Sequence, residues 1–149
     1  MSFDVFLQRF ERGRPVEATT VEILRVLDST QHTGPDAYGF YKVQFPDGAE
    51  VEFSAKGLGF GDTFPGCAFH IRASSALLAD FVLEVARAGG MTIMPAMGES
   101  LVLLPSEEAL QDLPPDIVAN FRPVILSNSA ELHGILEKGC SAWLGFLRG

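Results

Sequence analysis

The chain contains 149 residues, of which 47% are hydrophobic and 20% are charged. Its length is typical of one folded domain, and its composition excludes intrinsically disordered, fibrous and disulfide-stapled proteins. The 19 acidic side chains outnumber the 11 basic ones and give a formal net charge of -8 at pH 7. This charge disfavours nucleic acid and anionic membranes as partners, because both attract mainly Lys and Arg. It either keeps a small domain soluble or attracts a basic partner.

The sequence also suggests a compartment. No apolar run approaches the roughly 20 residues that a membrane-spanning helix needs, and residues 1–4 lack the basic start of a secretory signal. The two cysteines, Cys67 and Cys140, lie far apart in apolar segments, which favours reduced thiols over a disulfide framework. We therefore expect a cytoplasmic protein.

The first predicted strand covers residues 3–10, where the side chains alternate between two faces. One face of this strand is apolar and is expected to point into the core: Phe3, Val5 and Leu7. The other face mixes polar and aromatic side chains: Asp4, Phe6, Gln8 and Phe10.

A helix is predicted next, because Thr19 followed by Glu22 forms a capping-box pattern. We expect this helix to end near residue 28 and to bury three apolar side chains: Val21, Leu24 and Leu27. A polar stretch over residues 29–36 then predicts a loop. Two alternating segments, 38–45 and 50–54, flank a turn sequence and predict a β-hairpin.

The same order of elements occurs a second time. Residues 67–72 predict a strand that turns Phe69 and Ile71 inward and His70 and Arg72 outward. A helix follows, with Ser74 or Ser75 as its N-cap and a Gly-Gly pair after its last turn. Its apolar side chains recur at helical spacing: Leu78, Phe81, Val82 and Val85. Residues 91–94 and 100–104 predict another hairpin.

The remaining residues cannot form a core of their own and must pack on the rest of the chain. Ser106 predicts a short helical turn, and three prolines over residues 114–123 predict a stiff connector. Asn128 and Glu131 predict the start of a final helix, with one apolar side: Leu132, Ile135, Leu136, Cys140, Trp143 and Leu144.

These elements define the expected fold, an α+β domain built from tandem β-α-β-β modules. The modules span residues 3–54 and 67–104, and a helical extension spans residues 106–149 within one domain, 1–149. We expect a mainly antiparallel sheet with helices on one face and a C-terminal helix. The sequence leaves open whether both modules share one sheet.

Several segments resemble a group of uncharacterised small bacterial proteins: residues 2–8, 81–91, 113–114 and 140–143. That resemblance implies a bacterial source and carries no activity or functional residue. The doubled order of elements is similar, in topology alone, to the tandem modules of gyrase-inhibitor-like effector-binding domains. In that family two modules face each other around a ligand cleft, but no motif of the family is present here.

Signals for catalysis and for metal binding are weak. Cys67 and His70 are three apart on a strand and face opposite sides. His133 and Glu137 are four apart on the final helix and favour an ordinary surface contact. The nucleophile and phosphate-loop motifs that mark common enzyme families are absent from the sequence. We therefore predict no metal, no cofactor and no catalytic residue.

A glycine-rich segment, 56–66, joins the two modules and carries two phenylalanines. In one interpretation it is an irregular connection with Phe60 and Phe64 packed against the core. In the other it is a lip over a cleft, where Phe60, Asp62 and Phe64 contact a ligand or partner.

The outward face of the sheet provides the second candidate surface. It carries Phe6 and Phe40 beside the polar His70 and Arg72, and Phe6, Phe10 and Phe40 are too apolar for a fully hydrated face. Three explanations remain open: cover by the C-terminal helix with Trp143, cover by a second copy in a homodimer, or a ligand cleft.

The functional hypothesis is a non-enzymatic binding protein of the cytoplasm that engages a basic protein partner, as an immunity protein engages a toxin. The acidic charge and the missing catalytic motifs support it. The first alternative is a small-molecule binding domain with its cleft between the modules, and the second is an enzyme without a recognisable motif.

Overall fold

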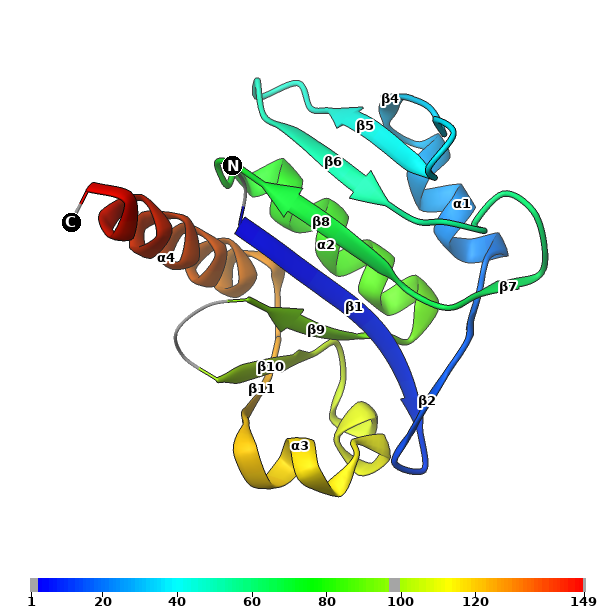
Figure 1. The fold of residues 1–149 in the computed structure, drawn as a ribbon, viewed down its shortest axis with the longest axis vertical. Helices are drawn as coiled ribbons and strands as arrows, with labels where there is room; N and C mark the ends of the chain where they lie inside the picture. The colour runs from blue at the N-terminus through cyan, green and yellow to red at the C-terminus, as the bar shows by residue number, and fades with distance from the viewer. Residues whose placement is uncertain (1–2, 97–99, 149) are drawn as a thin grey trace.

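The computed structural model confirms the α+β class and contains one large, mainly antiparallel sheet (Figure 1). It describes residues 3–96 and 100–148, and of residues 142–148 the backbone only. The predicted turn over residues 97–99 and the side chains of Trp143 and Leu144 lie outside this described part.

The elements follow one another along the chain with few long loops. The strands are β1 (Phe3–Glu11), β2 (Arg14–Val16), β3 (Ala18–Thr19), β4 (Gln31–Thr33), β5 (Phe40–Gln44), β6 (Glu50–Ser54), β7 (Thr63–Phe64), β8 (Cys67–Ile71), β9 (Thr92–Pro95), β10 (Leu101–Leu104) and β11 (Arg122–Ile125). The helices are α1 (Val21–Asp28), α2 (Ala76–Gly89), the short 3-10 helix η1 (Glu107–Asp112), α3 (Pro115–Asn120) and α4 (Ser129–Arg148).

Both modules share this sheet, whose strand order is β11-β10-β9-β1-β8-β6-β5-β4, with β2 beside the end of β1. The opening strands β1 and β8 pair antiparallel at the centre. Each of them pairs on its other side with the hairpin of the opposite module: β1 with β9, and β8 with β6. The modules are therefore interleaved, and β10 with β11 forms the one parallel pair on this path.

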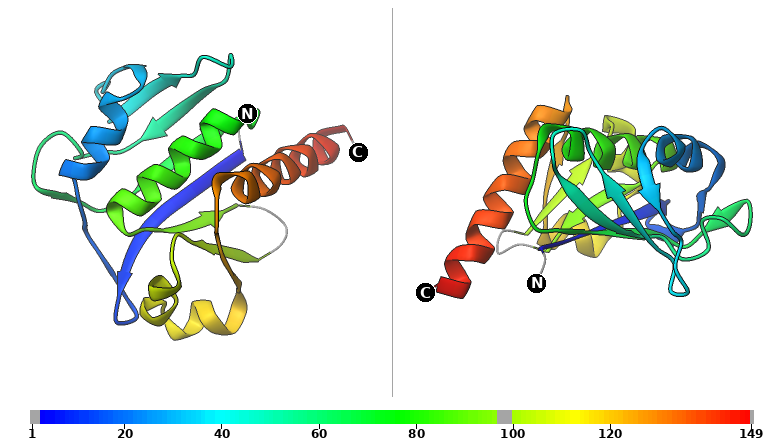
Figure 2. Two further views of the ribbon diagram at one scale, coloured as in Figure 1. Left: turned by 180° about the vertical axis from the view of Figure 1, so that it is seen from behind. Right: turned by 90° about the horizontal axis from the view of Figure 1, so that it is seen from above.

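Helices α1, α2 and the start of α4 cover one face of the sheet (Figure 2). The core between the layers contains a cluster of three buried phenylalanines. Phe53 of β6 stacks on Phe69 of β8 with ring centroids 4.8 Å apart, and Phe81 of α2 meets both rings edge-on. Burial of Phe3, Val5 and Leu7 confirms the predicted inward face of β1.

A second, smaller cluster lies on the opposite face of the sheet near β10. Because successive residues of a strand point to opposite faces, Val102 and Leu104 pack away from the helical core. The chain covers them with Leu113 and Ile117, which η1 and α3 bring over this end of the sheet. Phe10 packs here as well, so its apolar character has an explanation within the chain.

Some predictions about local structure were wrong. Burial of Leu27 in α1 is confirmed and Leu24 is partly buried, but Val21 is 57% exposed and the helix also buries Ile23. The predicted loop over residues 29–36 includes the short strand β4. The predicted connector contains α3 and the edge strand β11. Pro115 is tolerated at the first turn of α3, where its missing N–H would have no intrahelical partner.

Helix α2 depends on its predicted N-cap, where the Ser75 hydroxyl accepts a hydrogen bond from the Leu78 N–H at 3.1 Å. We expect Ser75→Ala to lower the free energy of unfolding by about 1 kcal/mol, because this N–H would lose its partner. Ser106→Ala is the matched control, since Ser106 precedes η1 without any side-chain cap bond. Urea unfolding of both variants would measure the difference, and equal losses would contradict a capping role for Ser75.

Candidate interaction face of the sheet

The face opposite α2 is left uncovered over β5, β6, β8 and the first half of β1 (Figure 1). We call this surface the open face. The strand register arranges its side chains in two rows that run across the strands. The charged row contains Lys42, Glu52, His70 and Asp4. The apolar row contains Phe40, Ser54, Ala68, Phe6 and Met94.

His70 is the most enclosed side chain of the charged row. Its Nδ1 lies 2.8 Å from Asp4 Oδ1 across the central strand pair, and its ring stacks on Phe40 with centroids 5.7 Å apart. A carboxylate only accepts hydrogen bonds, so Nδ1 carries the hydrogen and donates it. Nε2 is buried and has no hydrogen-bond partner among the described residues.

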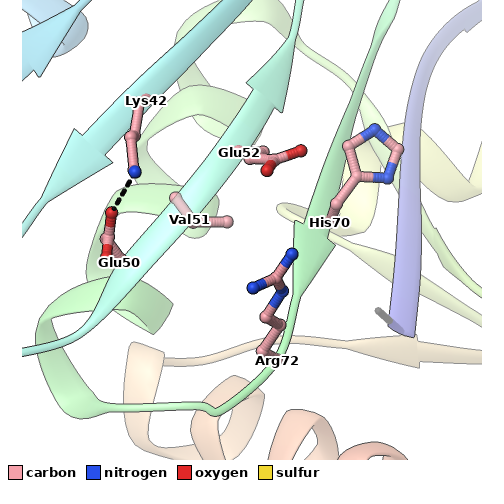
Figure 3. A pocket seen from close by; sticks show the side chains of 6 residues that line it. All are labelled: Lys42, Glu50, Val51, Glu52, His70 and Arg72. Carbon is pink, nitrogen blue, oxygen red and sulfur yellow. Dashed lines mark ion pairs between the residues drawn. The ribbon is translucent and has the colours of Figure 1, made fainter. Parts of the chain in front are cut away.

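Two positive charges of the open face act on Glu50. Lys42 Nζ lies 3.0 Å from Glu50 Oε1, and this hydrogen bond, with the charge of Arg72, lowers the pKa of Glu50 below its ordinary value. Glu52 has no ion pair or hydrogen bond from any side chain that the structure describes. In Figure 3 its carboxylate lies toward His70 and away from the pair of Lys42 and Glu50. Glu52 thus presents a carboxylate without a direct partner among the described side chains near the middle of the open face, where Lys42 and Arg72 line the same hollow.

Four members of the apolar row, Ser54, Ala68, Phe6 and Met94, line a shallow trough of about 530 Å³, and Lys56 lines it as well. Two small side chains, Ser54 and Ala68, stand between the large side chains Phe40 and Phe6 along the row. Phe6 is 46% exposed. The trough is open to solvent and continues past Phe6 to its rim: Pro15, Pro65 and Met94.

One interpretation of the sequence required the C-terminal helix to cover this face. Helix α4 does not cover it. Its buried side chains, Leu132 and Leu136, belong to the core on the other side of the sheet. Gly139 sits directly against the Phe3 ring, where a Cβ atom would lie 2.6 Å from a ring carbon. Within the described part of the chain, Phe6 therefore has no covering element.

The glycine-rich segment, 56–66, agrees with neither interpretation completely. Phe64 is 1% exposed and belongs to the core, so it cannot contact a ligand. Phe60 is 87% exposed, contrary to the expectation that it packs against the core. The carbonyl of Asp62 accepts a hydrogen bond from the Thr20 N–H at 3.0 Å, which ties the segment to the start of α1. The three residues therefore do not form one site.

A second histidine cluster, which the sequence analysis missed, joins α2 to α4. Ser74 Oγ lies 2.8 Å from His133 Nδ1, and His133 Nε2 lies 3.5 Å from Glu137 Oε1. The spacing of His133 and Glu137 predicted their contact, but Ser74 is 59 residues away in sequence and nothing indicated it. The cluster fastens α4 beside the N-terminus of α2.

The two cysteines are free and buried. Burial raises the pKa of the Cys67 thiol far above its ordinary value. Burial, assisted by the charge of Glu137, also raises the pKa of Cys140. Because the thiolate is the reactive form, both side chains behave as apolar core residues.

Within residues 3–96 and 100–148, no group of three or more His, Cys, Asp or Glu side chains is placed to hold a metal ion. No helix in the same ranges combines the length and apolarity needed to cross a membrane. Comparison of the chain with protein-family models, curated proteins and solved structures finds no match. The assignment of a function therefore depends on the geometry of the open face.

Proposed function

We propose that the protein is a non-enzymatic binding module of the bacterial cytoplasm that engages a basic protein partner through the open face. The observation that carries this proposal is the carboxylate of Glu52, which has no partner among the described side chains and stands in a row next to the apolar row that contains the exposed Phe6. A single exposed phenylalanine needs no explanation in itself. Here it stands in an uncovered apolar row, directly beside a row of charged groups, in the middle of a large sheet.

Electrostatics support a basic partner over other classes. The net charge of -8 attracts positively charged surfaces from a distance and repels acidic ones. At short range, the carboxylate of Glu52 is a hydrogen-bond acceptor. Lys and Arg supply donors and no acceptors. A partner that presents such side chains complements Glu52.

The shape of the surface favours a protein over a small molecule. The sheet is continuous across the two modules, and the trough lies over strands of both. A small ligand typically has most of its surface enclosed, whereas this trough is open to solvent. A partner with its own surface can supply the missing cover.

Octa-arginine provides a defined probe for this proposal. In an NMR titration of the ¹⁵N-labelled protein, we expect amide shifts to change in β5, β6 and β8, with little change in α1 and α2. Affinity is expected to fall as salt is added, since exposed charges are screened over about 10 Å at 0.1 M.

Glu52→Gln should weaken octa-arginine binding more than Glu84→Gln, which removes the same charge from the exposed side of α2. Equal weakening by both variants would indicate attraction by net charge alone and would contradict a site on the open face. Sedimentation at several protein concentrations provides a second check. A dimer that protects the amides of the open face would show that a second copy, and not a basic partner, occupies it.

A further inference from the structure

We infer that the open face recognises an extended basic segment of its partner in which a Lys or Arg and a large apolar residue are separated by one residue. This inference rests on the proposed function and specifies what the partner presents. It follows from the distance between the charged row and the apolar row.

The two rows are adjacent along every strand of the open face. On β6, Glu52 belongs to the charged row and Ser54 to the apolar row. Residues two apart on a strand point to the same side and are roughly 6.7 Å apart. An extended peptide has the same period, so its residues i and i+2 both face the sheet at this distance. Adjacent residues of such a peptide point to opposite sides.

The charged row provides one place for the basic residue. Lys42 and Arg72 repel a cation; Lys42 is paired with Glu50 at 3.0 Å, and Arg72 lines the same hollow as Glu52. Glu52 is the carboxylate of this row without a partner among the described residues, and it lies on the side toward His70. A Lys or Arg that approaches from the solvent can therefore pair with Glu52 while the existing pair stays intact.

The apolar row provides the place for the second residue. The trough lies over Ser54 and Ala68, the two small side chains of this row. A Phe, Leu or Met placed there contacts the exposed side of Phe6. Burial of this apolar surface on both partners supplies affinity that salt does not screen.

Three peptides of identical composition test the spacing. Gly-Thr-Arg-Thr-Phe-Thr-Gly and Gly-Thr-Phe-Thr-Arg-Thr-Gly carry the two residues at i and i+2 in both orders. Gly-Thr-Arg-Phe-Thr-Thr-Gly carries them side by side. In NMR titrations, we expect the better of the spaced peptides to bind about tenfold tighter than the adjacent one, the change that one well-placed contact provides.

Variants of the protein locate the effect. Ala68→Phe fills the trough and should abolish the advantage of the spaced peptides, while the matched control Ala130→Phe at an exposed position on α4 should keep it. Phe6→Ser removes the wall of the trough and should act in the same direction as Ala68→Phe. It provides an independent result if the larger side chain disturbs the sheet.

The outcomes separate this inference from the function on which it rests. If octa-arginine binds the open face but the three peptides bind equally, the binding function stands and the spacing rule is overturned. If the spaced peptides keep their advantage in both Ala68→Phe and Phe6→Ser, the trough is not the apolar site. If neither octa-arginine nor any peptide shifts the open face, both proposals fail.

Discussion

Phe69→Ala is expected to lower the free energy of unfolding by about 3–5 kcal/mol, a large part of the stability of a domain of this size. Phe69 is fully buried on the central strand β8. Its ring stacks on Phe53 and meets Phe81 edge-on, so one truncation removes contacts to both layers of the core. Guanidinium unfolding followed by circular dichroism would measure the loss.

The matched control is Phe6→Ala, which makes the same change on the neighbouring strand but on the open face. Because Phe6 is 46% exposed, its truncation leaves no buried cavity and should cost less than about 1 kcal/mol. Phe69→Leu should fall between the two. Similar losses of unfolding free energy for Phe69→Ala and Phe6→Ala would show that the two faces of the sheet are equally packed. That result would contradict the burial of Phe69 and the exposure of Phe6.

Gly39→Ala is expected to destabilise the fold by about 2–4 kcal/mol, through backbone conformation and through crowding. Gly39 has a φ of +83°, and a Cβ atom there would lie 2.8 Å from the Cα atom of Lys56. The contact is with backbone, so no side chain can rotate away from it. The carbonyl of Gly39 also accepts a hydrogen bond from Ala55 at 3.0 Å, which holds the ends of β5 and β6 together.

Gly48→Ala separates the two causes. Gly48 has a similar φ of +89°, but no atom lies within 4 Å of its hypothetical Cβ. Its substitution should therefore cost about 1–2 kcal/mol, the conformational part alone. Chemical unfolding of both variants measures the difference, and a loss for Gly48→Ala as large as that for Gly39→Ala would contradict the crowding at Lys56.

Local pattern was sufficient to predict the fold class and the inward faces of the strands. Alternation reveals a strand when one side is buried, as for Phe69 and Ile71 of β8, and both are fully buried. Helix α2 was predicted well because its N-cap, its apolar spacing and the left-handed Gly90 at its end all agree. Each of these signals lies within a few residues of the element that it marks.

Predictions from local sequence patterns were wrong where contacts with distant segments determine the structure. The capping box predicted at Thr19 does not form, and Thr20 instead donates its hydroxyl hydrogen to the carbonyl of Gly61 at 2.7 Å. Pro123 suggested a connector, yet β11 is an edge strand in which the amides of Arg122 and Leu126 face β10. The nitrogen of Pro123 faces away from β10, so the absence of an N–H at this residue costs no hydrogen bond.

The same limit applies to the candidate surface. Several of its residues were predicted strand by strand, because each strand reveals its own outward side. The charged row could not be predicted, since it depends on register between strands such as β1 and β8, whose paired residues Asp4 and His70 are 66 positions apart. Sequence alone therefore identified some members of the open face, such as Phe6, Phe40 and His70, but not which of them are neighbours.

The interleaving of the two modules has a consequence for biosynthesis. The first half of β1 pairs only with β8 and β9 within the described structure, so it has no partner on a ribosome that has made just the first module. Until residues 67–95 emerge, Phe3, Val5 and Leu7 remain available to wrong contacts. Pairing over such sequence separations slows folding and prolongs exposure to aggregation. The nascent chain should therefore depend on chaperones until its second half is complete.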